Sequence, residues 1–163
     1  MDKSEDKDTD NYKVLFVCLG NICRSPLAEG VFYDLVCKND LVEKIEVDSC
    51  GTGSWHVGNL PHEGSVKVAK KNGIDITYQR SRQLEVSDLS DFDLIVAMDS
   101  SNKENILSLG SVNPSKVVLM RDYEPNAESP DVPDPYYGGG FDKVYDIINV
   151  SCANLFEEVK GKL

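Results

Sequence analysis

A short apolar run at residues 14–17 (Val-Leu-Phe-Val) ends at Cys18, and an Arg-Ser-Pro sequence at 24–26 follows after only five intervening residues. The run is typical of a buried parallel strand, and proline suits the first turn of a helix. The segment therefore predicts a strand, a tight loop and a helix. In that arrangement the loop N–H groups and the positive end of the helix converge on one point, as anion binding requires.

Two side chains of this segment carry chemistry. The Arg24 guanidinium can donate two parallel hydrogen bonds to phosphate oxygens. Helix N-termini and cationic neighbours stabilise thiolates, so we expect Cys18 to be ionised at neutral pH and able to attack a bound phosphoryl group. Read separately, Cys18 is a buried strand-end cysteine and Arg24 a surface charge, but their joint spacing favours a phosphate site. The Gly-Lys-Ser/Thr ending of nucleotide-binding loops is absent.

Hydrophobic patterns along the rest of the chain alternate between strands and helices. The sequence predicts strands at 13–18, 43–49, 94–98 and 116–120, and helices that begin near 27, 62, 101 and 141. The second helix is predicted to stop at 72–73, and 101–104 (Ser-Asn-Lys-Glu) forms a capping box for the third. We therefore expect one three-layer α/β domain, with a four-stranded parallel sheet and helices on both faces.

In such a sheet, ligands bind beyond the carboxyl ends of the strands. Cys18 closes the first predicted strand, Asp99 follows the third, and Asp134 lies in the loop after the fourth. Phosphate-ester cleavage also needs an acid for the leaving oxygen, and the proline-rich loop 130–135 offers Asp134, with Asp131 as a competitor. The alternative to this catalytic role is that residues 134–139 form only a turn.

These segments together resemble the low-molecular-weight protein tyrosine phosphatases. The resemblance rests on 17–26 (Val-Cys-Leu-Gly-Asn-Ile-Cys-Arg-Ser-Pro), 98–102 (Met-Asp-Ser-Ser-Asn) and 134–137 (Asp-Pro-Tyr-Tyr), supported by 51–55 and 73–76. It implies a phosphotyrosine protein phosphatase I-like, Rossmann-like domain at 12–163, after a polar leader at 1–11. It favours Asp134 as the acid, because that residue precedes Pro-Tyr-Tyr as the family's acid does.

The resemblance implies roles for a larger set of residues. Cys18 forms a phosphocysteine, Arg24 clamps the phosphate, and Asp134 serves as acid and then as base, with no cofactor or metal. Trp55, Tyr136 and Tyr137 wall the cleft; the alternative is that the tyrosines are exposed loop residues and that Trp55 belongs to the core. Ser25 is expected to bond the Cys18 thiolate or, alternatively, to cap the helix. The remaining implied residues are the phosphate-binding loop Leu19, Gly20, Asn21, Ile22, Cys23, Arg24 and Ser25, and the loop supports Asn21, Ser25, Gln79 and Asp99.

Two positions, 79 and 22, differ from residues found in the family or in some of its relatives. Where the family usually has a histidine that supports the loop asparagine, this chain has Gln79, whose amide can donate the same hydrogen bond without titrating. Relatives that act on phosphoarginine typically carry threonine where this chain has Ile22. Ile22 and Leu19 are expected to line an apolar slot, which suits an aromatic ring better than a guanidinium.

Composition limits partners and compartment. The formal charge of −11 disfavours nucleic acid, and residues 1–10 are expected to stay disordered because they combine five acids with two lysines. No apolar run or signal-peptide core indicates a membrane, and an odd set of five cysteines indicates neither a disulfide framework nor a zinc site. We expect a cytoplasmic monomer or weak dimer that acts on phosphotyrosine proteins, with phosphate as product and inhibitor. Alternatives are an arsenate reductase, which would need a further thiol pair, and a catalytically silent phosphate-binding module.

Overall fold

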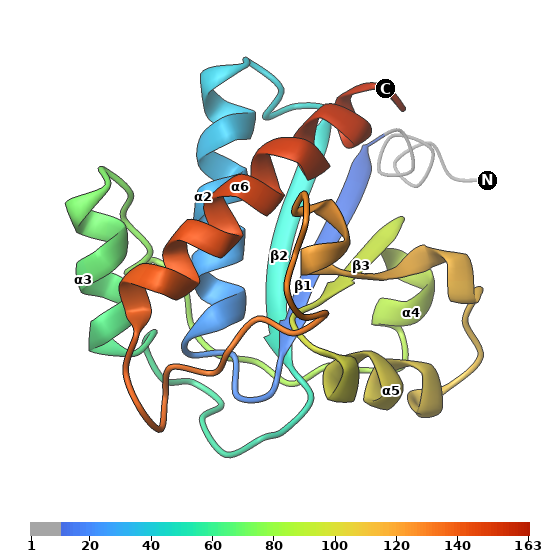
Figure 1. Cartoon of the computed structure of the whole chain (residues 1–163). Helices are drawn as coiled ribbons and strands as arrows, with labels where there is room; N and C mark the ends of the chain where they lie inside the picture. Colours follow the sequence, from blue (N-terminus) through green and yellow to red (C-terminus); the bar gives the residue numbers. More distant parts are fainter. Residues whose placement is uncertain (1–10) are drawn as a thin grey trace.

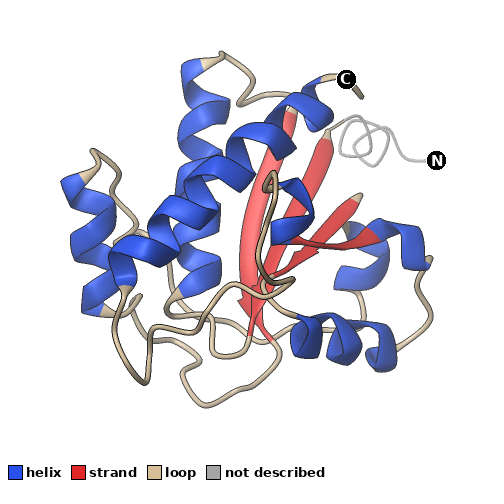
Figure 2. Ribbon diagram, in the orientation of Figure 1, coloured by secondary structure: helices blue, strands red, loops and turns tan. Residues whose placement is uncertain are grey.

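Parallel strands form the centre of the molecule (Figures 1 and 2). In the computed structural model, which describes residues 11–163, they are β1 (Tyr12–Cys18), β2 (Ile45–Gly51), β3 (Leu94–Ala97) and β4 (Val117–Leu119). Their order across the sheet is β2-β1-β3-β4, and each neighbouring pair is parallel. The predicted four-stranded parallel sheet is therefore confirmed, with β1 paired on both of its edges.

Helices cover both faces of the sheet, which confirms the three layers (Figure 1). One face carries α2 (Arg24–Lys38) and α6 (Phe141–Lys160), with α3 (Glu63–Lys71) packed against both helices. The other face carries α4 (Asp88–Asp91) and α5 (Ser100–Leu109). Two 3₁₀ turns, η1 (Pro114–Lys116) and η2 (Met120–Tyr123), flank β4.

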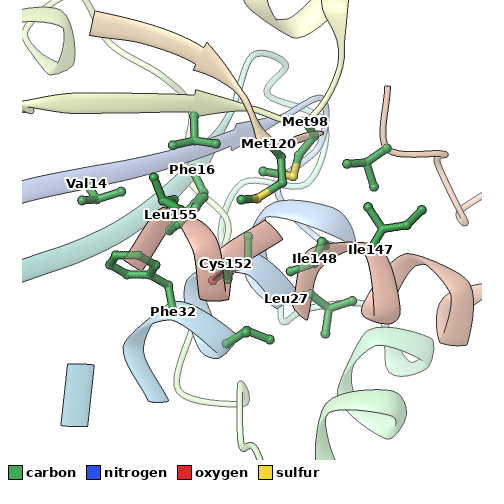
Figure 3. Packing of buried hydrophobic residues seen from close by; sticks show 14 of the residues in the cluster. Val14, Phe16, Leu27, Phe32, Met98, Met120, Ile147, Ile148, Cys152 and Leu155 are labelled. Atoms are coloured by element: carbon green, nitrogen blue, oxygen red, sulfur yellow. Dashed lines mark hydrogen bonds between the residues drawn. The ribbon is translucent and has the colours of Figure 1, made fainter. Parts of the chain in front are cut away.

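Strand β1 is apolar at successive positions because it is buried on both faces. Val14 and Phe16 pack in the cluster beneath α2 and α6, where the Phe16 and Phe32 rings meet edge to face with centroids 5.6 Å apart (Figure 3). Leu15 and Val17 pack on the opposite side with residues of α4 and α5. Two cores on one strand hold Cys18 at its carboxyl end in a fixed position.

The start of α5 differs from the prediction. The expected capping box at 101–104 is wrong, because Ser101 already lies inside the helix. Asp99 is the N-cap instead, and its Oδ1 accepts a hydrogen bond of 2.8 Å from the Asn102 amide. Asp99 has an extended backbone between β3 and the helix, and its carboxylate reaches the third amide of the helix, which is the role of a capping aspartate.

Other boundaries differ by a few residues. The second strand begins at Ile45 rather than at 43, because the amides of Lys44 and Ile45 both bond back to the Leu41 carbonyl in a turn. The predicted leader at 1–11 lies, apart from Asn11, outside the described residues. Within residues 11–163, no helix is long and apolar enough to cross a membrane.

Candidate active site

A cleft of about 360 Å³ opens at the carboxyl ends of the strands. Of the residues predicted for the site, it brings together Cys18, Leu19, Gly20, Ile22, Cys23, Arg24, Trp55, Asp134, Tyr136 and Tyr137. His56 also lines it and was not predicted. Asn21, Ser25, Gln79 and Asp99 are not among the lining residues, so any influence they have on the cleft passes through other groups.

The loop between β1 and α2 turns its carbonyls away from the cleft. The Cys18 and Leu19 carbonyls each accept an amide hydrogen bond of 2.9 Å from residues 52 and 53, just beyond β2. The Ile22 carbonyl accepts from the His62 amide at 2.7 Å. The Gly20 and Cys23 carbonyls accept from buried serine hydroxyls of Ser81 and Ser65, each at 3.0 Å.

Because its carbonyls are bonded on the outside, the loop between β1 and α2 forms a cradle whose inner surface determines which ligand it can hold. In a trans peptide the N–H points opposite to the C=O, so carbonyls held outward leave the N–H groups to face inward. A concave set of N–H groups at the start of α2 is an anion site. The close packing also explains a small residue at Gly51, where a Cβ would lie 2.7 Å from the Leu19 carbonyl oxygen.

The Cys18 sulfur lies at the base of this cradle. The residue is only 2% exposed, and its Sγ accepts a hydrogen bond of 3.2 Å from the Asn21 amide. The Ser25 Oγ lies 3.1 Å from the same sulfur. Ser25 sits inside the first turn of α2, and Cys23 takes the N-cap position, so Ser25 is placed to bond the sulfur and does not cap the helix.

Asn21 holds the bend of the loop. It has φ of +56°, a left-handed conformation that costs most residues energy and that asparagine tolerates best after glycine. Its Oδ1 accepts from the Arg82 amide at 3.0 Å, and its Nδ2 donates to Ser25 Oγ at 2.8 Å and to Ser49 Oγ at 3.1 Å. Both ends of the amide thus have partners, the buried Ser25 and Ser49 at Nδ2 and the half-buried Arg82 at Oδ1.

The Arg24 guanidinium is buried and held by acceptors. Its Nη1 donates to Asp99 Oδ2 at 2.7 Å and to the Val132 carbonyl at 3.0 Å, while its Nη2 lies 3.7 Å from Asp134 Oδ2. Burial opposes its charge, but neighbouring Cys18, followed by Asp99, raises the pKa of Arg24. The cation is therefore fixed at the cradle, and Asp99 connects it to the start of α5.

The structure separates the two candidate acids. Asp131 Oδ1 accepts from both the amide (2.8 Å) and the hydroxyl (3.0 Å) of Ser100, at the first turn of α5. Asp134 lines the cleft, with one oxygen toward Arg24 and the other accepting from the Tyr136 amide at 3.0 Å. Asp131 is bonded to the start of a helix, whereas Asp134 faces the cleft.

Aromatic rings form the open side of the cleft. Trp55 is 71% exposed and Tyr137 is 80% exposed, so Trp55 does not belong to the core. Tyr136 packs between its neighbours, with ring centroids 5.0 Å from Tyr137 and 5.9 Å from His56. An aryl ring entering the cleft meets flat apolar surfaces on which it can stack.

The comparison with known families agrees with this geometry. The sequence model described as "Low molecular weight phosphotyrosine protein phosphatase" matches residues 13–163. The chain belongs to this family. The YfkJ protein of Bacillus subtilis, named a low molecular weight protein-tyrosine-phosphatase, is 45% identical over 148 residues, or 90% of this chain and 95% of its own. A Schizosaccharomyces pombe phosphatase of the same type is 51% identical over 144 residues, covering 84% and 90% of the two chains.

Solved structures of the family superpose closely. The crystal structure of Bacillus subtilis YfkJ gives a TM-score of 0.90 at 43% identity, covering 93% of this chain and 96% of that chain. A Drosophila protein described as an arginine phosphatase gives 0.83 at 37% identity, covering 91% and 98%. The fold is therefore shared by phosphatases whose names indicate different phosphorylated residues.

The support behind the loop differs from the one expected of this family. Gln79 makes no hydrogen bond with Asn21, and its Nε2 donates instead to the Pro26 carbonyl at 3.0 Å. The prediction that this amide replaces the histidine's hydrogen bond is therefore wrong. Ser49 supports Asn21 instead, and its own Oγ donates to Glu29 Oε1 at 2.6 Å. Sequence reasoning missed both residues. The available signal was an acid at Glu29 among the apolar positions of a helix.

Burial makes Glu29 an unusual carboxyl. Desolvation is the main cause that raises its pKa to about 7 from an ordinary 4.5, and Asp48 adds to the rise. The hydrogen bonds from Ser49 and Tyr78, and the charge of Arg82, act in the opposite direction. The folded protein thus holds a proton on this carboxyl at pH values where the unfolded chain has lost it.

Folding stability is expected to depend on this proton. Between about pH 4.5 and pH 7 the folded state binds more protons at Glu29, so this contribution to stability falls as pH rises, by at most about 3 kcal/mol. Urea unfolding of the parent and of Glu29→Gln, each at pH 5 and pH 7.5, measures it. The parent should lose more stability than the variant over this range, and equal losses would contradict the assignment.

Cys23 offers a second thiol in the same loop. Its side chain is buried, and burial, followed by the charges of Cys18 and Asp134, raises the pKa of Cys23 to about 12. Cys23 therefore remains a protonated thiol beside the reactive sulfur. Oxidation of Cys18 to a sulfenic acid removes the Cys18 charge, which is one of the causes that raise the pKa of Cys23.

We expect Cys23 to protect the oxidised enzyme. Peroxide converts the Cys18 thiolate to a sulfenic acid, and attack by the Cys23 sulfur then forms a disulfide and releases water, which a dithiol reverses. After peroxide and then reductant, Cys23→Ser should recover less activity than the parent. Equal recovery would return Cys23 to a packing role.

Proposed function

We propose that this protein hydrolyses phosphotyrosine in proteins, and small aryl phosphates, through a phosphocysteine intermediate. The observation that carries the proposal is the anion cradle, in which a buried cysteine sulfur and a buried arginine share one site with Asp134. Membership of the phosphatase family supports the same chemistry. The aromatic opening of the cleft suits a phenyl ring.

The first half of the reaction uses three groups. The Cys18 sulfur attacks phosphorus while the bond to the tyrosine oxygen breaks, and Asp134 gives its proton to that oxygen. Arg24 and the loop N–H groups of residues 19–25 stabilise the charge on the equatorial oxygens, which is the main contribution proteins make to phosphoryl transfer.

The second half releases phosphate. Asp134, now a carboxylate, takes a proton from water as the water oxygen attacks phosphorus and the bond to Cys18 breaks. The thiolate and the carboxyl are thereby restored. Inorganic phosphate is the product, and we expect it to inhibit by occupying the same cradle. Ser25 is placed to donate to the thiolate when it departs.

We also propose a cytoplasmic location and a monomer or weak dimer. The cysteines of the chain are all free, which fits a reducing compartment. A sedimentation experiment across a range of protein concentrations tests the oligomeric state. Fractionation of cells that express the tagged chain tests the location.

One assay tests the proposed activity. Purified protein with a chromogenic aryl phosphate, in the presence of reductant and chelator, should release phosphate and should stop after thiol alkylation. Absence of turnover together with retained phosphate binding would favour the silent binding module. Arsenate reduction coupled to a dithiol donor would favour the reductase.

The choice of substrate depends on the apolar part of the loop. Ile22 is 8% exposed and lines the cleft beside Leu19, where it offers no hydrogen bond to a guanidinium or to its attacking water. We expect phosphotyrosine to be preferred over phosphoarginine by at least about tenfold in kcat/KM, or about 1.4 kcal/mol.

A single peptide sequence carrying either modification measures this preference, first with the parent and then with Ile22→Thr. In the threonine variant, the ratio of kcat/KM on phosphotyrosine to kcat/KM on phosphoarginine should be smaller than in the parent. A parent that prefers phosphoarginine, the activity named for the Drosophila relative, would overturn the tyrosine assignment and leave the cysteine mechanism intact.

A further inference from the structure

A buried carboxyl lies behind the loop and takes no part in the chemistry proposed above. Glu29 of α2 is 7% exposed, and each of its oxygens has one partner. Oε1 accepts a hydrogen bond of 2.6 Å from Ser49 Oγ, and Oε2 accepts one of 3.0 Å from the Tyr78 hydroxyl. Burying a carboxyl is costly unless hydrogen bonds compensate it, so its position calls for a function.

The hydrogen bonds continue from Glu29 to the reactive sulfur. Ser49 Oγ and Ser25 Oγ both accept from the single Asn21 Nδ2, at 3.1 and 2.8 Å, and Ser25 Oγ lies 3.1 Å from Cys18 Sγ. An amide nitrogen only donates, so each serine must direct its own hydrogen away from Asn21. One hydrogen then goes to Glu29, and the other is left for Cys18 or for the Cys50 carbonyl, which lies 3.4 Å from Ser25 Oγ.

We propose that Glu29 is a positioning residue which, by accepting the Ser49 hydroxyl, fixes Asn21 in the conformation that directs its backbone N–H at Cys18. The proposal rests on the function proposed above. Without an acceptor at Glu29, the Ser49 hydroxyl is free to turn its hydrogen toward Asn21 Nδ2, and that contact becomes repulsive. The left-handed backbone of Asn21 then loses one of its side-chain anchors.

Protonation of Glu29 leaves this role intact. A proton on Oε2 faces the Tyr78 hydroxyl, which is part of a half-exposed side chain and can accept it while donating elsewhere. Oε1 still accepts from Ser49 in both states. The other charged groups that act on Glu29 are Asp48 of β2 and Arg82 of the following loop. An uncharged acceptor of the same shape should therefore serve.

Two substitutions at one position test the idea. Glu29→Gln keeps an acceptor for Ser49, whereas Glu29→Leu removes it at similar volume. We expect the leucine variant to lose about tenfold in kcat on an aryl phosphate, while the glutamine variant stays within about twofold of the parent. The rate of Cys18 alkylation by iodoacetamide, resolved by peptide mass spectrometry, should fall in parallel in the leucine variant.

The alkylation readout separates the two proposals, because it needs no substrate. If the parent fails to turn over any aryl phosphate, the proposed function fails while the alkylation rates still decide on Glu29. The leucine variant leaves the Ser49 and Tyr78 hydroxyls without their acceptor, so it is expected to melt earlier than the parent. A merely structural role predicts that loss of stability alone, with unchanged Cys18 reactivity.

A second pair of variants tests the same proposal if Glu29→Leu does not fold. Ser49→Ala removes the same link from the other side and should reproduce the losses in kcat and in alkylation. Ser151→Ala is the matched control, because Ser151 is also buried but lies on α6. Parental rates in Glu29→Leu or Ser49→Ala, or equal losses in the leucine and glutamine variants, would overturn the proposal.

Discussion

Replacing Cys18 by serine is expected to abolish turnover of aryl phosphates while phosphate still binds. A serine hydroxyl in the same position is not ionised at neutral pH and is a poor nucleophile. The cradle of N–H groups and Arg24 is unchanged by the substitution, so the anion site remains. Phosphate release by the variant should fall to the level of a blank reaction.

Phosphate binding by the variant can be measured with a fluorophore that the chain already contains. The protein contains one tryptophan, Trp55, and it lines the cleft. Titration of its fluorescence with inorganic phosphate should give a similar dissociation constant for the parent and for Cys18→Ser. Cys37→Ser, at an exposed cysteine, is the matched control and should keep full activity. Turnover that survives in Cys18→Ser would exclude the phosphocysteine route.

Replacing Asp134 by alanine is expected to lower kcat by about 10²–10⁴ on phenyl-type esters. The loss arises because the leaving oxygen must depart as an anion when no acid protonates it. Esters with an acidic leaving group need little protonation and should be least affected. A series of substituted phenyl phosphates measures this, and the dependence of kcat on leaving-group acidity should become steeper in the variant.

Asp131→Ala is the control for Asp134. Asp131 binds the first residue of α5, so its loss should lower the melting temperature by removing two hydrogen bonds to Ser100. The dependence on the leaving group should stay as in the parent. A larger loss of rate in Asp131→Ala, with the steeper dependence appearing there, would assign the acid to the wrong residue.

The sequence was sufficient where a local pattern and a global constraint agree. The apolar run at 14–17 predicts a strand buried on both faces, and β1 is such a strand, with Cys18 at its end. Asp99 and Asp134 were expected at the same edge, since parallel strands direct their carboxyl ends there. In the structure both approach Arg24.

The supports of the loop were harder to predict because they depend on side-chain contacts between distant elements. The place of Gln79 in the sequence predicts a contact with Asn21, but its amide donates to the Pro26 carbonyl. Ser49 and Glu29 meet only because β2 packs against α2, and no spacing in the chain records that contact. Likewise, Asp99 caps the helix in place of the expected capping box, because β3 ends at Ala97 and the helix already begins at Ser100.

The central place of β1 in the sheet ties the cradle to the stability of the whole domain. A strand paired on both edges opens only when most of the structure unfolds, so the anion site persists until global melting. An anion that binds this site alone stabilises the folded state by thermodynamic linkage, by about 2.7 kcal/mol at one hundred times its dissociation constant. Heat resistance of the purified protein therefore reports how fully phosphate, or any mimic of it, occupies the loop.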